Sequence, residues 1–187
     1  MILKKIMLIN FNLYKNIGLI FLICTACTST IKPIESKKSS QVQILECPEG
    51  WGCSFELLKN KSAKIEFDKF NNSFLTILDS SKSNVLKFKY SRNHIPGTAD
   101  SGYDEVILLN IDNLLNNINL TDASLADVDA IFGRMCFCTA ESVGYFPIRN
   151  GHLKIKKMNK NRFKIDFSFK LETVPQVMEN ISEILQF

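Results

Sequence analysis

The chain has 187 residues, with 23 basic and 19 acidic side chains and a formal net charge of +4. This length is enough for one domain with a sizeable core and too short for two ordinary domains. Because the basic residues form no dense cluster or stripe, the sequence argues against a nucleic-acid partner.

The first 26 residues have the composition of a secretory signal peptide. Three lysines are their only charged residues, and an uninterrupted apolar run at 17–24 precedes the small residues Thr25 and Ala26. As a helix this run would be about 12 Å long, against a hydrocarbon core of about 30 Å, so a transmembrane span is not expected. We predict cleavage after residue 26, which removes no acidic residue and leaves 20 basic against 19 acidic side chains, a net charge of +1.

Cys27 follows directly in the stretch LICTAC. This stretch resembles the lipobox of bacterial lipoproteins, in which cleavage leaves a lipid-modified cysteine as the new N-terminus; Cys24 stands where a lipobox usually has leucine. The resemblance covers about the first thirty residues. It implies lipidation of Cys27 and a place in the cell envelope, at the outer rather than the inner membrane. The alternatives are a secreted protein cleaved after Ala26 without a lipid, and an uncleaved anchor.

Residues 27–40 are expected to be a lipid-anchored tether. The thirteen residues after Cys27, TSTIKPIESKKSS, are mostly polar and show no periodicity. Fully extended, they would span at most about 45 Å, which lets the domain stand away from the membrane. The remaining residues, 41–187, are expected to form a single β domain.

Alternation of apolar and polar residues dominates this domain and predicts antiparallel strands. The expected strands cover residues 42–46, 53–58, 63–68, 74–78, 85–91, 105–111, 130–138, 144–148, 152–158 and 162–172. Many short strands separated by turn residues indicate an all-β fold, either an antiparallel β-sandwich or a barrel.

Two of these segments carry more specific information. Residues 162–172 alternate strictly, and with the turn Asn159-Lys160-Asn161 they predict a hairpin over 152–172. Residues 105–111, EVILLNI, are apolar at consecutive positions, which is typical of a central strand covered on both faces.

Two segments indicate helical structure. Residues 173–187 place six apolar side chains on one helical face, with Thr173 and Gln176 in capping-box spacing and Pro175 in the first turn. We therefore expect a short C-terminal helix. Residues 120–130, LTDASLADVDA, are expected to form a helical turn or a loop.

Four cysteines of the domain are disulfide candidates. Cys47 and Cys53 flank a Pro/Gly loop, whereas Cys136 and Cys138 lie two residues apart in a predicted strand. There their Cα atoms would be about 6.7 Å apart with parallel Cβ vectors, at the limit of disulfide geometry. In an oxidising compartment we therefore expect each of them to pair with a cysteine of the first loop, with the loop around Trp51 lying across them.

The size of the enclosed loops favours this cross-pairing. A Cys53–Cys136 link would contribute about 4.5 kcal/mol by the chain-entropy estimate, against about 2.4 kcal/mol for Cys47–Cys53. Free or singly paired thiols are one alternative. A metal or redox centre is the other, although the spacing fits a four-thiolate zinc site poorly.

No catalytic constellation is evident. The two histidines are His94, in a loop, and His152, on the lysine-bearing side of its strand; neither accompanies a nucleophile motif. Asp100, Asp104 and Glu105 lack calcium-loop spacing and are interpreted as a solvated acidic loop. The sequence therefore predicts no catalytic residue, metal or cofactor.

The whole resembles small lipoproteins of the Gram-negative envelope: signal, lipid cysteine, tether and disulfide-stapled β domain. The resemblance implies a binding or structural interaction module. Its expected partners are the membrane, through the lipid, and a protein or small apolar ligand. The alternatives are an exported thiol redox or metal-binding protein, with a reducible Cys136/Cys138 pair, and an exported hydrolase, in which His94 meets an acid or a cysteine.

Overall fold

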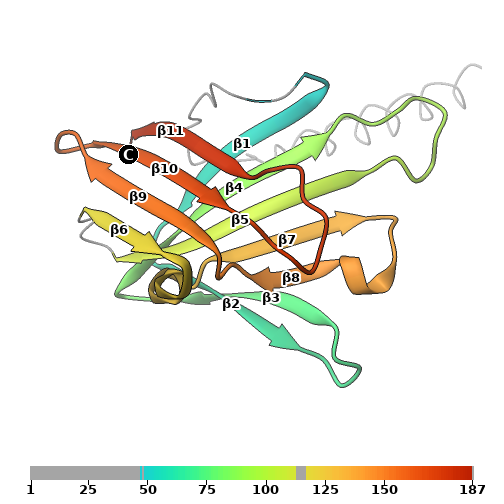
Figure 1. Cartoon of the computed structure of the whole chain (residues 1–187), viewed down its shortest axis with the longest axis horizontal. Helices are drawn as coiled ribbons and strands as arrows, with labels where there is room; N and C mark the ends of the chain where they lie inside the picture. Colours follow the sequence, from blue (N-terminus) through green and yellow to red (C-terminus); the bar gives the residue numbers. More distant parts are fainter. Residues whose placement is uncertain (1–46, 48, 113–116, 187) are drawn as a thin grey trace, which may run out of the picture. The chain divides into compact units, whose positions relative to one another are not determined.

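Strand pairing in the domain is antiparallel throughout, as the computed structural model in Figure 1 shows. The structure describes residues 47, 49–112 and 117–186, which all belong to one compact unit, Ser39–Phe187. The predicted signal peptide, the tether with Cys27 and the strand expected at 42–46 lie outside the described residues.

The strands form three sheets with open edges. The first has the order β1 (Trp51–Leu58), β4 (Ser83–Arg92), β5 (Tyr103–Asp112), β7 (Ile131–Cys136), β8 (Gly144–Pro147). The second has the order β11 (Asn180–Gln186), β10 (Arg162–Phe169), β9 (Gly151–Lys157), β6 (Ile118–Thr121). The third is the hairpin β2 (Lys61–Phe67) and β3 (Ser73–Asp79). The predicted all-β class is therefore confirmed.

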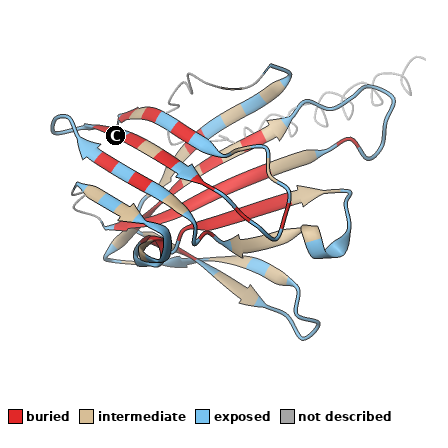
Figure 2. Cartoon of the chain, viewed as in Figure 1, coloured by how far each residue is buried: buried red, intermediate tan, exposed pale blue. Residues whose placement is uncertain are grey.

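The five-stranded sheet is the middle layer of the domain. The face that we call its inner face packs against the four-stranded sheet, and Phe88, Ile107 and Phe132 meet Ile155 and Phe167 in the larger core. The opposite face packs against the hairpin in a smaller core, which includes Val85, Val106, Leu108, Ile131 and Ala63. As a result β5 is buried along most of its length (Figure 2), which confirms the prediction for residues 105–111.

One asparagine ties the hairpin to the middle sheet. Asn110 of β5 donates to the carbonyl of Ala63 at 2.9 Å, and its Oδ1 accepts from the amide of Ala63 at 2.8 Å. The same side chain donates to Asp129 Oδ2 at 2.9 Å. The side-chain amide of Asn110 thus bonds the N–H and C=O groups of Ala63 as a neighbouring strand would, and it satisfies two buried backbone groups of β2.

The predicted C-terminal helix is wrong: residues 180–186 form β11, which pairs with β10. Ile181, Glu183 and Leu185 face inward and are buried, so a charged residue interrupts the apolar alternation that would have identified a strand. Gln176 does not cap a helix. Its side chain instead accepts from the amide of Leu171 and donates to two carbonyls, which holds residues 171–178 as a loop.

The segment predicted as a helical turn or a loop contains both a strand end and a helical turn. Its first residues complete β6, and Asp122–Val128 form the 3₁₀ helix η1. A second short 3₁₀ helix, η2, covers Ala140–Ser142. The hairpin predicted over 152–172 is confirmed as β9 and β10, with Phe163, Ile165 and Phe167 buried. No helix within the described ranges is long and apolar enough to cross a bilayer.

Candidate functional site

The candidate site lies on the inner face of the middle sheet, at the end where polar side chains replace the apolar core. Phe55, Phe88, Ile107 and Phe132 form a buried apolar row across β1, β4, β5 and β7. Two residues further along each strand, on the same face, the next row consists of Cys53, Tyr90, Glu105 and Arg134. The change from one row to the next marks the boundary between core and site.

Glu105 is the centre of this polar row and is fully buried. Its Oε1 accepts hydrogen bonds from the hydroxyl of Tyr103 and from the amide of Val177, both at 2.6 Å. Its Oε2 accepts from the amide of Met178 at 2.8 Å. The carboxyl group therefore fixes the segment before β11, 72 residues further along the chain.

Arg134 is joined to Glu105 through a tyrosine. Its Nε donates to the Tyr103 hydroxyl at 3.2 Å, and its guanidinium lies 5.3 Å from the centre of the same ring. The hydroxyl thus accepts from the arginine and donates to the carboxylate. Burial raises the pKa of Tyr103, and the hydrogen bond to Glu105 raises it further, with Arg134 opposing both effects. Arg134 also donates to the carbonyl of Ser142 at 3.0 Å, which anchors η2.

Aromatic rings extend the site toward the first residue of β1. Trp51 stacks on Tyr90 with ring centroids 4.5 Å apart and meets Tyr103 edge to face at 5.5 Å. The guanidinium of Arg92 lies 5.8 Å from the Trp51 ring and 5.5 Å from Tyr103. Because Trp51 is half-buried and Arg92 is exposed, this aromatic and cationic group reaches the surface.

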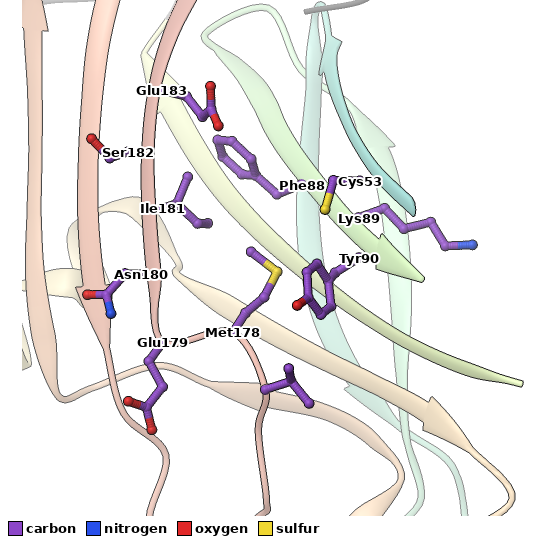
Figure 3. Close-up of a pocket in the computed structure, with 11 residues that line it drawn as sticks. Cys53, Phe88, Lys89, Tyr90, Met178, Glu179, Asn180, Ile181, Ser182 and Glu183 are labelled. Carbon is purple, nitrogen blue, oxygen red and sulfur yellow. The ribbon is translucent and has the colours of Figure 1, made fainter. Parts of the chain in front are cut away.

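A cavity of about 260 Å³ opens beside the polar row, between β1 and β4 on one side and β11 with its preceding segment on the other. Figure 3 shows Phe88, Tyr90 and Cys53 facing Met178 and Ile181 across it. The full lining is Cys53, Phe88, Lys89, Tyr90, Val177, Met178, Glu179, Asn180, Ile181, Ser182 and Glu183.

The polar row and the cavity share their walls. Tyr90 lines the cavity and stacks on Trp51, and the backbone amides held by Glu105 belong to the lining residues Val177 and Met178. The shape of the cavity therefore depends on the hydrogen bonds of Glu105.

All four predicted cysteines form disulfides, but the predicted cross-pairing is wrong. Cys47 pairs with Cys53, with Cα atoms 5.7 Å apart, and Cys136 pairs with Cys138 at 5.3 Å. The strand geometry assumed for Cys138 does not hold, because β7 ends at Cys136 and the chain bends there. Trp51 does not lie across these cysteines as a loop but is the first residue of β1.

His94 does not meet an acid or a cysteine. Its Nδ1 lies 2.6 Å from the hydroxyl of Ser101 in the β4–β5 loop, and that hydroxyl also accepts from the amide of Ile95 at 3.0 Å. Neither His94 nor Ser101 lines the cavity. These contacts close the loop on itself. His152 is exposed, as expected, and contacts Asn119 at 2.7 Å.

The acidic residues 100–105 do not form one loop surface. Asp104 pairs with Lys89 at 2.9 Å, whereas Glu105 points into the protein. Among the residues that the structure describes, no three His, Cys, Asp or Glu side chains are grouped as metal ligands.

Glu105 and Arg134 were not predicted as site residues. The signal that could have identified them is a charged residue beside or within an apolar strand, because charged side chains are rarely buried without a partner. The roles of Val177, Met178 and Glu183 were hidden by the helical interpretation of their segment. Comparison with protein-family models, with curated proteins and with solved structures gives no match to this chain.

Proposed function

We propose that this protein is an envelope lipoprotein, anchored by a lipid on Cys27, whose β domain binds a small, largely apolar ligand between β4 and β11. The observation that carries the binding proposal is the cavity, whose facing walls Phe88, Tyr90, Met178 and Ile181 are apolar or aromatic. Concave sites with mainly apolar walls and a few polar groups are typical of small-molecule binding.

The chemistry of the lining restricts the ligand. About 260 Å³ is small for a drug-sized molecule, so the ligand is one ring system or a short acyl group. Glu183, which is 3% exposed, and Tyr90 are polar residues on the walls that face each other. The side chains of Asn180 and Ser182 lie on the opposite, exposed face of β11. A neutral or cationic polar group on the ligand therefore fits better than an anionic one.

The architecture supports this proposal. We infer that the two larger sheets form a β-sandwich, with the cavity at the side where the edge strand β11 faces β1 and β4. Because the cavity opens at this side, a ligand can enter without separating the two sheets along the rest of their shared core.

Binding is tested with a neutral naphthylamine dye that becomes fluorescent in apolar surroundings, excited outside the tryptophan absorption. The folded domain is expected to bind it saturably. Met178→Trp, which fills the cavity, should weaken binding at least about tenfold. Ile184→Trp is the matched control, because Ile184 lies on β11 but does not line the cavity. Equal binding by the two variants, or no saturable binding, would contradict the proposal; thermal unfolding of each variant checks that it is folded.

The anchor is tested separately by the intact mass of the protein purified from its native membrane fraction. A chain that begins at Cys27 and carries added acyl mass is expected. A chain that begins there without acyl mass would contradict lipidation and leave the binding proposal untouched.

A further inference from the structure

The two disulfides differ in how open they are to other molecules. Cys53 lies within β1 and lines the cavity beside Tyr90, and both Cys47 and Cys53 are half-buried. Cys136 is the last residue of β7, and Cys138 lies beyond the strand and is exposed. A thiol approaching from solvent therefore reaches the second disulfide at Cys138 more readily than it reaches the first.

The Cys136–Cys138 bond contributes little to the stability of the fold. It spans two positions in sequence, against six for Cys47–Cys53, and the restriction of the unfolded chain grows with the size of the closed loop. The end of β7 is held independently, because its strand pairs with β5 up to Tyr103 and Cys136. Arg134 adds hydrogen bonds to Tyr103 and to Ser142. Opening the bond should leave this end of the sheet in place.

The surroundings favour thiol exchange. Arg134 lies two residues before Cys136 on the same face of β7, and a neighbouring cation stabilises the thiolate that leaves when a disulfide is attacked. Phe137, between the two cysteines, is 82% exposed. An exposed aromatic side chain beside a reactive bond provides an apolar contact for a protein partner.

We propose that Cys136–Cys138 is a redox-active disulfide that exchanges with a protein dithiol. The partner's thiolate attacks Sγ of Cys138, the bond between the two sulfurs breaks, and Cys136 leaves as a thiolate. The partner's second thiolate then attacks the partner's own sulfur in the mixed disulfide, and Cys138 leaves as a thiolate. The partner gains a disulfide, the domain gains two thiols, and the partner's two thiol protons end on Cys136 and Cys138. This inference concerns a site separate from the cavity and does not rest on the proposed function.

The first test compares the two disulfides in the same intact protein. The oxidised protein is incubated with a limiting dithiol, reduced thioredoxin, and quenched with a thiol-alkylating reagent; peptide mass then locates the tags. We expect Cys136 and Cys138 to be tagged at least about ten times faster than Cys47 and Cys53, while far-ultraviolet circular dichroism is unchanged. Equal rates, faster tagging of Cys47 and Cys53, or loss of structure on reduction of Cys136–Cys138 would overturn the proposal.

The second test identifies the attacked sulfur. In Cys136→Ser, Cys138 keeps an exposed thiol with no resolving neighbour and should trap a partner disulfide as a stable mixed disulfide. Cys138→Ser is the matched control: it leaves the half-buried Cys136 and should trap at least about tenfold less. Equal trapping by the two variants, or trapping by Cys138→Ser alone, would overturn the assignment of Cys138 as the attacked sulfur.

Discussion

The side chain of Glu105 accepts a hydrogen bond of 2.6 Å from the backbone amide of Val177, which joins the middle strand β5 to the segment that precedes the edge strand β11. A second bond, from the amide of Met178, doubles this connection. A buried carboxylate with several donors is costly to place and costly to disturb. Because the two amides belong to the cavity wall, this contact links the stability of the fold to the shape of the candidate site.

Glu105→Gln should therefore destabilise the domain by about 2–3 kcal/mol, since one acceptor oxygen becomes an amino group that faces a donor. Asp104→Asn is the neighbouring control. It removes only the partly exposed pair with Lys89, which should cost at most about 1 kcal/mol. Urea denaturation of both variants measures the difference. Similar losses for the two would contradict the role assigned to Glu105. Dye binding should also weaken in Glu105→Gln.

The tyrosines of the domain make its stability sensitive to alkali. Burial raises the pKa of Tyr90, Tyr103 and Tyr145 above the ordinary value of 10.0, and Glu105 adds to the effect for the first two. The folded state therefore holds these protons more tightly than the unfolded state does. This contribution to stability is fully present below pH 10 and is lost as the pH rises through the folded pKa values.

We expect the tyrosinate ultraviolet absorbance of these three residues to rise only above pH 10, together with a fall in the free energy of unfolding. Titration of the native protein and of the urea-unfolded protein measures both effects. Tyr103→Phe should remove one of the delayed transitions. If the native and unfolded titration curves coincide, the tyrosines are not protected as described.

Much of the fold could be predicted because its strands carry their burial in the local sequence. Phe163, Ile165 and Phe167 alternate with polar residues since one face of β10 is solvated, and the continuous apolar run of β5 reflects layers on both faces. β11 could not be predicted in this way. Its inward-facing Glu183 breaks the alternation, and Ile181, Ile184 and Leu185 then match a helical spacing as well.

The site was less predictable, because it depends on register between distant strands. Nothing local places Cys53, Tyr90 and Glu105 in one row. The pairing of Cys53 with Tyr90, 37 residues later, and of Tyr90 with Glu105, 15 residues later, does so. The disulfide pattern depends on where β7 ends. A strand continued by two residues would separate Cys136 and Cys138, whereas the bend after Cys136 brings their Cα atoms within 5.3 Å.

The contact between Asn110 and Ala63 predicts how firmly the hairpin is held. Asn110→Ala leaves the amide and the carbonyl of Ala63, a residue that is 2% exposed, without these partners and should cost about 2–4 kcal/mol. Asn119→Ala is the control, because Asn119 is exposed and its side chain contacts His152, which is exposed as well; its cost should stay within about 0.5 kcal/mol. Chemical denaturation measures both. Proteolysis within β2 and β3 should increase in Asn110→Ala alone.

The phenylalanines differ widely in burial, and one pair of variants compares a buried ring with an exposed one. Phe132 is fully buried where the middle sheet meets the four-stranded sheet, 6.2 Å from the ring of Phe169. Phe70, at the turn of the hairpin, is 71% exposed, and its ring lies 4.9 Å from the ammonium group of Lys69. Phe132→Ala should therefore lower the free energy of unfolding by about 3–5 kcal/mol, because it loses buried apolar contacts and leaves a cavity.

Phe70→Ala should change it by no more than about 0.5 kcal/mol, since the ring contributes little to the core and the cation contact is exposed. Thermal and urea unfolding of the two variants measure both effects under the same conditions. A large loss for Phe70→Ala would show that the hairpin turn is buried against other parts of the protein. A small loss for Phe132→Ala would contradict the shared core of the two larger sheets, because in that core the Phe132 ring is enclosed between the two sheets.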